Sequence, residues 1–166
     1  MVDVAGVRES YRAALAQRQA SLVREVSLFG SGDWGPRFSG TGAYRRLVGD
    51  SVSTLAVVST PVASAHLDAL GSRFVRRFPR RSALVPSPLA GTLSGVSAGQ
   101  AVAVALNGRI AAVSVAYRNP GGRPVRFSAL AGETAFRAGR NAVRVFVLTG
   151  SPAHPTLDAV KTSLTG

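Results

Sequence analysis

The sequence predicts a mainly β fold, an antiparallel two-sheet β-sandwich preceded by one amphipathic N-terminal helix. Apolar residues recur with a helical period up to residue 29 and with a period of two from Val52 onward. Asn107-Gly108 lies between two apolar runs, which is the strongest short-range signal for a β-hairpin. The 18 Gly and 9 Pro are spread along the chain and indicate many turns between short strands.

Residues 1–29 are predicted to hold the helix, with its body at 4–29. Asp3 supplies an N-cap and Gly30 ends the helix. Apolar residues at spacings of three, four or seven form one stripe, which we expect to dock on the β domain or on a catalytic partner. The stripe consists of Val4, Val7, Tyr11, Leu15, Leu22, Val26 and Phe29.

Residues 30–50 are predicted to be a glycine-rich connector held down by Trp34, Phe38 and Tyr44. Disordered segments contain few aromatic residues, so this segment is not expected to be a free linker. A phosphate-binding loop is excluded because no Gly-Lys-Ser/Thr follows the glycines.

The β-sandwich is predicted over residues 51–150. Its strands are expected at 52–58, 73–78, 88–95, 101–106, 110–117, 126–130 and 142–148. A short helix is expected at 61–70, and a single helical turn at 133–137, closed by Gly139. Residues 151–166 are predicted to be a C-terminal tail.

Little in the chain suggests catalysis. It has no cysteine, which excludes disulfides and thiolate-bound metals. Its two histidines, His66 and His154, and its eight acidic residues are scattered. His66 and Asp68 are two residues apart in the expected helix at 61–70, so they are predicted to point to different faces. We therefore predict no catalytic residue, no metal site, no cofactor and no enzymatic activity.

The net charge is +12, from 20 basic and 8 acidic residues, and nearly all of it lies in residues 30–150. Such a charge favours anionic partners, whether nucleic acids, acidic glycans or lipid surfaces. The candidate anion-binding residues are Arg73, Arg76, Arg77, Arg80 and Arg81. The alternative, which we favour, is an ordinary solvated strand face with Phe74 and Phe78 turned to the core. Every basic residue except Lys161 is arginine, which the codon usage of a GC-rich genome also explains.

No membrane span is predicted. Residues 82–108 carry no charge, but prolines, glycines and serines interrupt them in the manner of strands and turns. Residues 1–19 contain charged side chains and no apolar core, so no secretory signal is expected.

Three segments resemble a known family. They are LFGSGDWGPRFSGTGAYRRLVGD at 28–50, AVAVALNGRIAAVSVAY at 101–117 and FSALAGETAFRAGRNAVRVFVL at 127–148. They resemble the C-terminal region of bacterial membrane-anchored sulfatase-like proteins of the alkaline-phosphatase superfamily. The pattern of a strand, Asn-Gly, a strand and then a later strand after Gly-x-Asn is also similar to β-sandwich carbohydrate-binding modules.

The resemblance implies a non-catalytic accessory domain at the cell envelope, outside the membrane and next to a sulfatase-like catalytic domain or protein. It carries no functional residue over to this chain, because the metal ligands and nucleophile of that family lie in the catalytic domain. Without the resemblance, the lack of a signal peptide indicates the cytoplasm. The alternative function is a basic module that binds nucleic acid or an anionic glycan.

Overall fold

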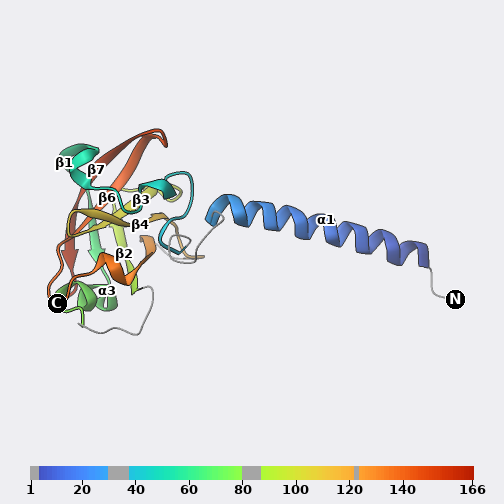
Figure 1. The fold of residues 1–166 in the computed structure, drawn as a ribbon, viewed down its shortest axis with the longest axis horizontal. Helices are drawn as coiled ribbons and strands as arrows, with labels where there is room; N and C mark the ends of the chain where they lie inside the picture. Colours follow the sequence, from blue (N-terminus) through green and yellow to red (C-terminus); the bar gives the residue numbers. More distant parts are fainter. Residues whose placement is uncertain (1–3, 30–37, 80–86, 122–123) are drawn as a thin grey trace.

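The computed structural model describes residues 4–29, 38–79, 87–121 and 124–166. Its main feature is one seven-stranded sheet with the strand order β4-β3-β6-β7-β1-β2-β5 (Figure 1). The strands are β1 (Ala56–Leu67), β2 (Ser87–Ser94), β3 (Ala101–Leu106), β4 (Arg109–Val115), β5 (Val125–Ala131), β6 (Val143–Ser151) and β7 (His154–Leu164). All neighbouring strands are antiparallel except β1 and β7, which are parallel.

The two edges of this sheet meet, so it forms a nearly closed barrel. Just beyond β4, Tyr117 exchanges two backbone hydrogen bonds of 2.8 Å with Arg126 of β5. The Ser114 hydroxyl of β4 also donates to the Ser128 carbonyl of β5. The predicted mainly β fold is therefore confirmed, but the strands form one curved sheet in place of two facing sheets. Closure leaves few unpaired strand edges, which otherwise invite aggregation.

The predicted hairpin at Asn107-Gly108 is confirmed and connects β3 to β4. Asn107 has φ 53° and Gly108 has φ 84°, the positive values that a tight two-residue turn requires. The Asn107 side chain accepts a hydrogen bond from the Ala142 amide at 3.1 Å and so ties the turn to the start of β6.

Side chains on both faces of β3, β4 and β6 are buried. On the inner face, Val104 and Phe127 belong to the main core cluster, which fills the barrel. On the outer face, Ala103 and Phe146 pack under Leu47 and Val52, which belong to two short 3-10 helices, η1 (Arg45–Leu47) and η2 (Val52–Thr54). Within the described part of the connector, residues 38–50, Leu47 thus packs on the outer face of the sheet, with Tyr44 and Val48 against the same cluster.

Tyr44 holds this part of the connector in place, because its hydroxyl donates to the Gly150 carbonyl at 2.6 Å.

The helix expected at 61–70 is wrong, because residues 61–67 continue β1 and a helix begins only after Asp68. Pro61 falls where the register of β1 against β7 shifts, between Val58 and Ala63. Proline lacks the N–H of a ladder hydrogen bond, so such an irregularity is where a strand tolerates it. Asp68 then begins the helix α3 (Ala69–Arg76), and the amide of Ser72 bonds to the Asp68 carbonyl at 2.9 Å.

The strand expected at 73–78 is also wrong, because most of it belongs to α3. Phe74 and Phe78 do lie on one side, as predicted, with ring centroids 6.2 Å apart. A spacing of four residues returns to the same face in a helix and in a strand, so it does not separate the two. Val75 is buried, and α3 packs against β2.

The tail expected at 151–166 is replaced by β7, a central strand of the sheet. It pairs with β6 on one side and β1 on the other, and Leu157 is fully buried. Its polar residues have partners within the sheet. The Asp158 carboxylate accepts from the Thr149 hydroxyl at 3.2 Å, and the Thr162 hydroxyl accepts from the Val145 amide at 3.1 Å.

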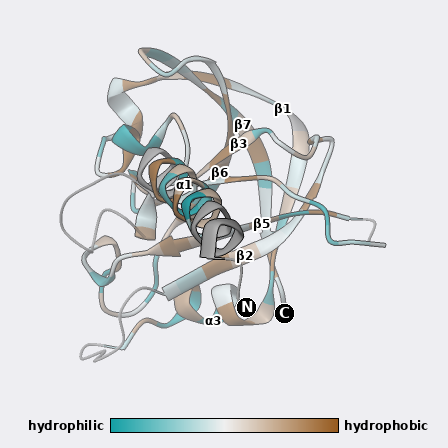
Figure 2. Ribbon diagram, turned by 90° about the vertical axis from the view of Figure 1, so that its right-hand side faces the viewer, coloured by the Kyte–Doolittle hydropathy of each residue, from teal (hydrophilic) through white to brown (hydrophobic). Residues whose placement is uncertain are grey.

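The predicted N-terminal helix is present as α1 (Val4–Phe29), and it extends away from the barrel (Figure 1). All residues from 11 to 24 are exposed, including Tyr11 and Leu22 at 64% and 52%. Figure 2, which looks along α1, shows hydrophobic and hydrophilic residues along it. This part of the stripe does not dock on the β domain, and the side chains of Val4, Val7, Val26 and Phe29 are outside the described ones.

No helix in the described residues is both long enough and apolar enough to cross a membrane.

Candidate anion-binding site

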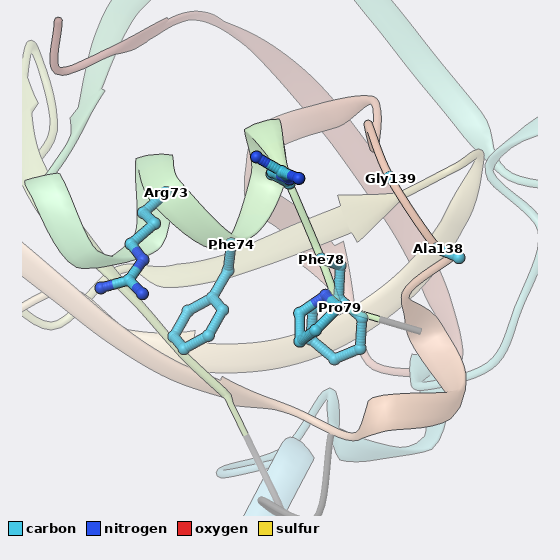
Figure 3. A pocket seen from close by; sticks show the side chains of 7 residues that line it. Arg73, Phe74, Phe78, Pro79, Ala138 and Gly139 are labelled. Carbon is cyan, nitrogen blue, oxygen red and sulfur yellow. The ribbon is translucent and has the colours of Figure 1, made fainter. Parts of the chain in front are cut away.

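A hollow of about 780 Å³ lies beside α3, and we call it the first hollow. Its described lining consists of Arg73, Phe74, Arg77, Phe78, Pro79, Ala138 and Gly139. Figure 3 shows Arg73 and Phe74 extending side by side from α3, with Phe78 and Pro79 next to them and Ala138 and Gly139 on the facing segment.

Helical and strand-like backbone together position this lining. Arg73 and Phe74 lie in the last turn of α3, and the Arg77 amide closes that turn on the Arg73 carbonyl at 3.0 Å. Phe78 then leaves the helix and exchanges two backbone hydrogen bonds with Gly139, at 2.8 and 3.0 Å. These two bonds hold the facing segment against the end of α3.

Phe74 and Phe78 form the aromatic part of the lining of the first hollow, and a third ring, Phe136, packs against both. Phe78 and Phe136 are stacked with centroids 4.3 Å apart and planes 7° apart. Phe74 packs against both rings at 6.2 and 6.5 Å. Phe78 and Phe136 are buried and Phe74 is partly buried, so the rings belong mainly to the core. Each such aromatic pair contributes roughly 1 kcal/mol beyond burial and so stabilises the packing of these rings.

The rim of the first hollow is cationic. Arg73 and Arg77 are exposed, and within the described parts of the chain neither guanidinium forms an ion pair. None of the seven lining residues is acidic. A guanidinium offers several N–H donors in one plane and binds carboxylate, sulfate or phosphate oxygens in a bidentate manner. The arrangement suits an anionic group.

Of the other predicted site residues, the structure describes only Arg76, which is not among the residues that line the first hollow. Arg76 lies on another side of α3 and lines a second hollow of about 520 Å³. The second hollow is lined by Val75, Arg76, Asn107, Arg140, Asn141, Ala142, Val143, Thr162 and Leu164. Arg80 and Arg81 lie outside the described residues. Sequence patterns did not point to Arg140, because it follows a glycine in a loop and belongs to no periodic run.

His66 and Asp68 have separate partners. The two ring nitrogens of His66 lie 3.0 Å from the Ser163 hydroxyl and 3.1 Å from the Thr165 hydroxyl. The Asp68 carboxylate forms an ion pair with Arg126. The two side chains thus bond to different groups. His66 lies in β1 and Asp68 is the N-cap of α3, whereas the prediction placed both in one helix.

The environment of Arg126 raises its pKa above the ordinary value, first through a hydrogen bond with Tyr117 and then through the charge of Asp68. His154 begins β7, where its amide donates to the Ser151 hydroxyl at 3.1 Å. In the described residues, no three His, Asp or Glu side chains are grouped so as to hold a metal ion.

Fold and site together define a mainly β barrel domain with an arginine-rimmed hollow at one end of its helix α3. Comparison with protein-family models, with curated proteins and with solved structures finds no match to the chain.

Proposed function

We propose that the chain is a non-catalytic accessory domain that binds an anionic group in the first hollow and acts beside a sulfatase-like catalytic domain or protein. The observation that carries the binding part is the pair of exposed guanidiniums, Arg73 and Arg77, which form no ion pair within the described residues and share a hollow with Phe74 and Phe78. The three segments that resemble sulfatase-like proteins support the accessory part. Of these, 101–117 and 127–148 supply most of β3, β4, β5 and β6.

The proposed sulfatase-like partner is tested by determining which protein the neighbouring reading frame upstream of Met1 encodes. A metal-dependent sulfatase domain there supports the accessory role, and an unrelated enzyme argues against it.

Binding is expected to depend on the first hollow and not on net charge alone. At about 0.15 M salt, where screening acts within about 8 Å, a sulfated disaccharide should bind the parent chain weakly. Arg73→Ala/Arg77→Ala should lower its affinity about tenfold, since each exposed charged contact contributes ~1 kcal/mol or less. NMR titration measures both affinities.

Arg12→Ala/Arg118→Ala is the matched control, because it removes the same charge from exposed positions outside the hollow. Equal losses in the two double variants would mean that binding follows net charge, and the first hollow would not be a site.

The domain is expected to have no hydrolase activity of its own. The reason is that His66, Asp68 and Asp158 each bond to a different polar neighbour and do not converge on one point. Purified protein is assayed against sulfate and phosphate esters with added divalent metals. Turnover that persists through repurification and disappears in His66→Ala would overturn the proposal.

The second candidate, a nucleic-acid-binding module, rests on the same arginines. It predicts that single-stranded DNA competes with the sulfated disaccharide for the first hollow. Bases stack on exposed aromatic side chains in such modules. Phe78 and Phe136 are buried here, which favours the first candidate.

A further inference from the structure

A third hollow, of about 560 Å³, lies at the tip of the β3–β4 hairpin and carries three more arginines. Arg45 and Arg46 come from η1, and Arg109 from the start of β4. The Arg109 guanidinium donates to the Gly49 carbonyl at 2.9 Å, which orients it along this rim. The described lining is Ser39, Arg45, Arg46, Val48, Gly49, Arg109, Ile110, Ala111, Gly132, Thr134 and Ala135.

One loop, residues 132–143, borders all three hollows. Gly132, Thr134 and Ala135 line the third hollow, Ala138 and Gly139 the first, and residues 140–143 the second. The first and second hollows also share the last turn of α3. Arg73 and Phe74 line the first hollow, and Val75 and Arg76 line the second. The second and third share the hairpin tip, through Asn107 and Arg109. The three hollows therefore adjoin one another around this loop, and we call the region that holds them the three-hollow surface.

This surface concentrates the positive charge of the domain. Of the twelve basic residues described between 38 and 166, seven line the three hollows, and no described lining residue is acidic. Two exposed acidic residues are direct sequence neighbours of the lining: Asp50 follows Gly49, and Glu133 lies between Gly132 and Thr134. Codon usage accounts for arginine in place of lysine, but it does not account for grouping on one surface. Grouped like charges repel and destabilise the fold unless an anion neutralises them.

We propose that this surface binds an extended anionic glycan, with successive sulfate or carboxylate groups in the three hollows. The proposal rests on the proposed function and names its ligand class. A single small anion occupies one hollow, whereas a chain with repeated charges engages arginines from η1, α3, β4 and the loop together. Linking such weak contacts raises affinity without new chemistry at any one of them.

A glycan fits this surface better than a single-stranded nucleic acid. Nonspecific binding of single strands combines phosphate contacts with aromatic side chains on which bases stack. The aromatic residues in the described lining are Phe74 and Phe78, which are partly buried and buried. Guanidinium pairs alone are sufficient to bind the anionic groups of a sulfated or uronic chain.

The experiment compares sulfated disaccharide, hexasaccharide and decasaccharide binding at about 0.15 M salt. The parent should bind more tightly as the chain lengthens. Arg46→Ala/Arg140→Ala removes one arginine each from the third and second hollows and leaves the first intact. This variant should bind the disaccharide like the parent and lose about tenfold affinity for the decasaccharide. Thermal melts of each variant verify folding.

The outcomes separate the two proposals. If Arg46→Ala/Arg140→Ala binds the decasaccharide like the parent, the extended surface is refuted while the first hollow stands. If Arg73→Ala/Arg77→Ala leaves disaccharide binding unchanged, the proposed function itself fails. Single-stranded DNA of matched charge should bind more weakly than the decasaccharide, and equal or tighter binding would overturn the choice of a glycan.

Discussion

Replacing Gly91 with alanine is expected to destabilise the barrel by about 3 kcal/mol, near the upper end for overpacking in a buried position. Gly91 lies in β2, paired with Leu67 of β1 on one side and Phe127 of β5 on the other. An added Cβ would collide with the backbone carbonyl oxygen of His66 and lie 2.9 Å from Cε1 of Phe127. The carbonyl cannot move away freely, because β1 is also paired with β7.

Urea denaturation of the variant and the parent measures this loss. Gly132→Ala is the control, because the nearest atom to its added Cβ is the Thr134 hydroxyl oxygen at 3.8 Å and its φ is −62°. The control should stay within about 0.5 kcal/mol of the parent. Similar midpoints for the two variants would mean that β1, β2 and β5 do not approach as closely as the structure shows.

Local signals in the sequence were sufficient for part of the barrel. The Asn107-Gly108 turn and the apolar runs around it predicted β3 and β4, because turn chemistry and alternation agree there. The single helical turn expected at 133–137 corresponds to the shorter 3-10 helix η3 (Glu133–Ala135). These elements depend on residues close together in the chain.

Elements that depend on distant partners were not predictable in the same way. The segment of β7 contains Thr156, Asp158 and Lys161, and its place between β1 and β6 comes from partners on both sides. Barrel closure rests on contacts such as Tyr117 with Arg126, which no local pattern encodes. Tertiary pairing therefore overrides the weak propensity of such segments.

In the candidate site, too, some features follow from the local sequence and others from contacts between distant residues. The sequence pointed to Arg73 and Arg77 as members of a cluster, because arginines and phenylalanines alternate there. In the strand that the alternation predicts, Arg76 falls on the face opposite Arg73 and Arg77, so the pattern already separates it from them. The pattern did not bring Ala138 and Gly139 to the same hollow, because two backbone hydrogen bonds to Phe78 do so.

The loop that borders the three hollows is held by one buried amide, Asn141. Its side-chain oxygen accepts from the Arg137 amide and from the Asn107 side chain, both at 2.7 Å. Its side-chain nitrogen donates to the carbonyls of Arg137 and Gly139, at 3.0 and 3.1 Å. The bonds of Asn141, together with that from the Ala142 amide to the Asn107 side chain, give both residues structural roles. Asn141 therefore connects the loop to the hairpin tip.

Asn141→Ala is expected to destabilise the domain by about 2–3 kcal/mol, because it removes the side-chain hydrogen bonds of a buried amide to Arg137, Gly139 and Asn107. It should also weaken binding of the sulfated disaccharide, since Ala138 and Gly139 of the first hollow lie within the loop that Asn141 closes. Chemical denaturation and NMR titration measure the two effects. Asn119→Ala, at an exposed loop position, is the matched control and should change neither. If Asn141→Ala lost stability but kept full affinity for the disaccharide, the loop would not shape the first hollow, and the arginines of α3 would have to bind the anion alone.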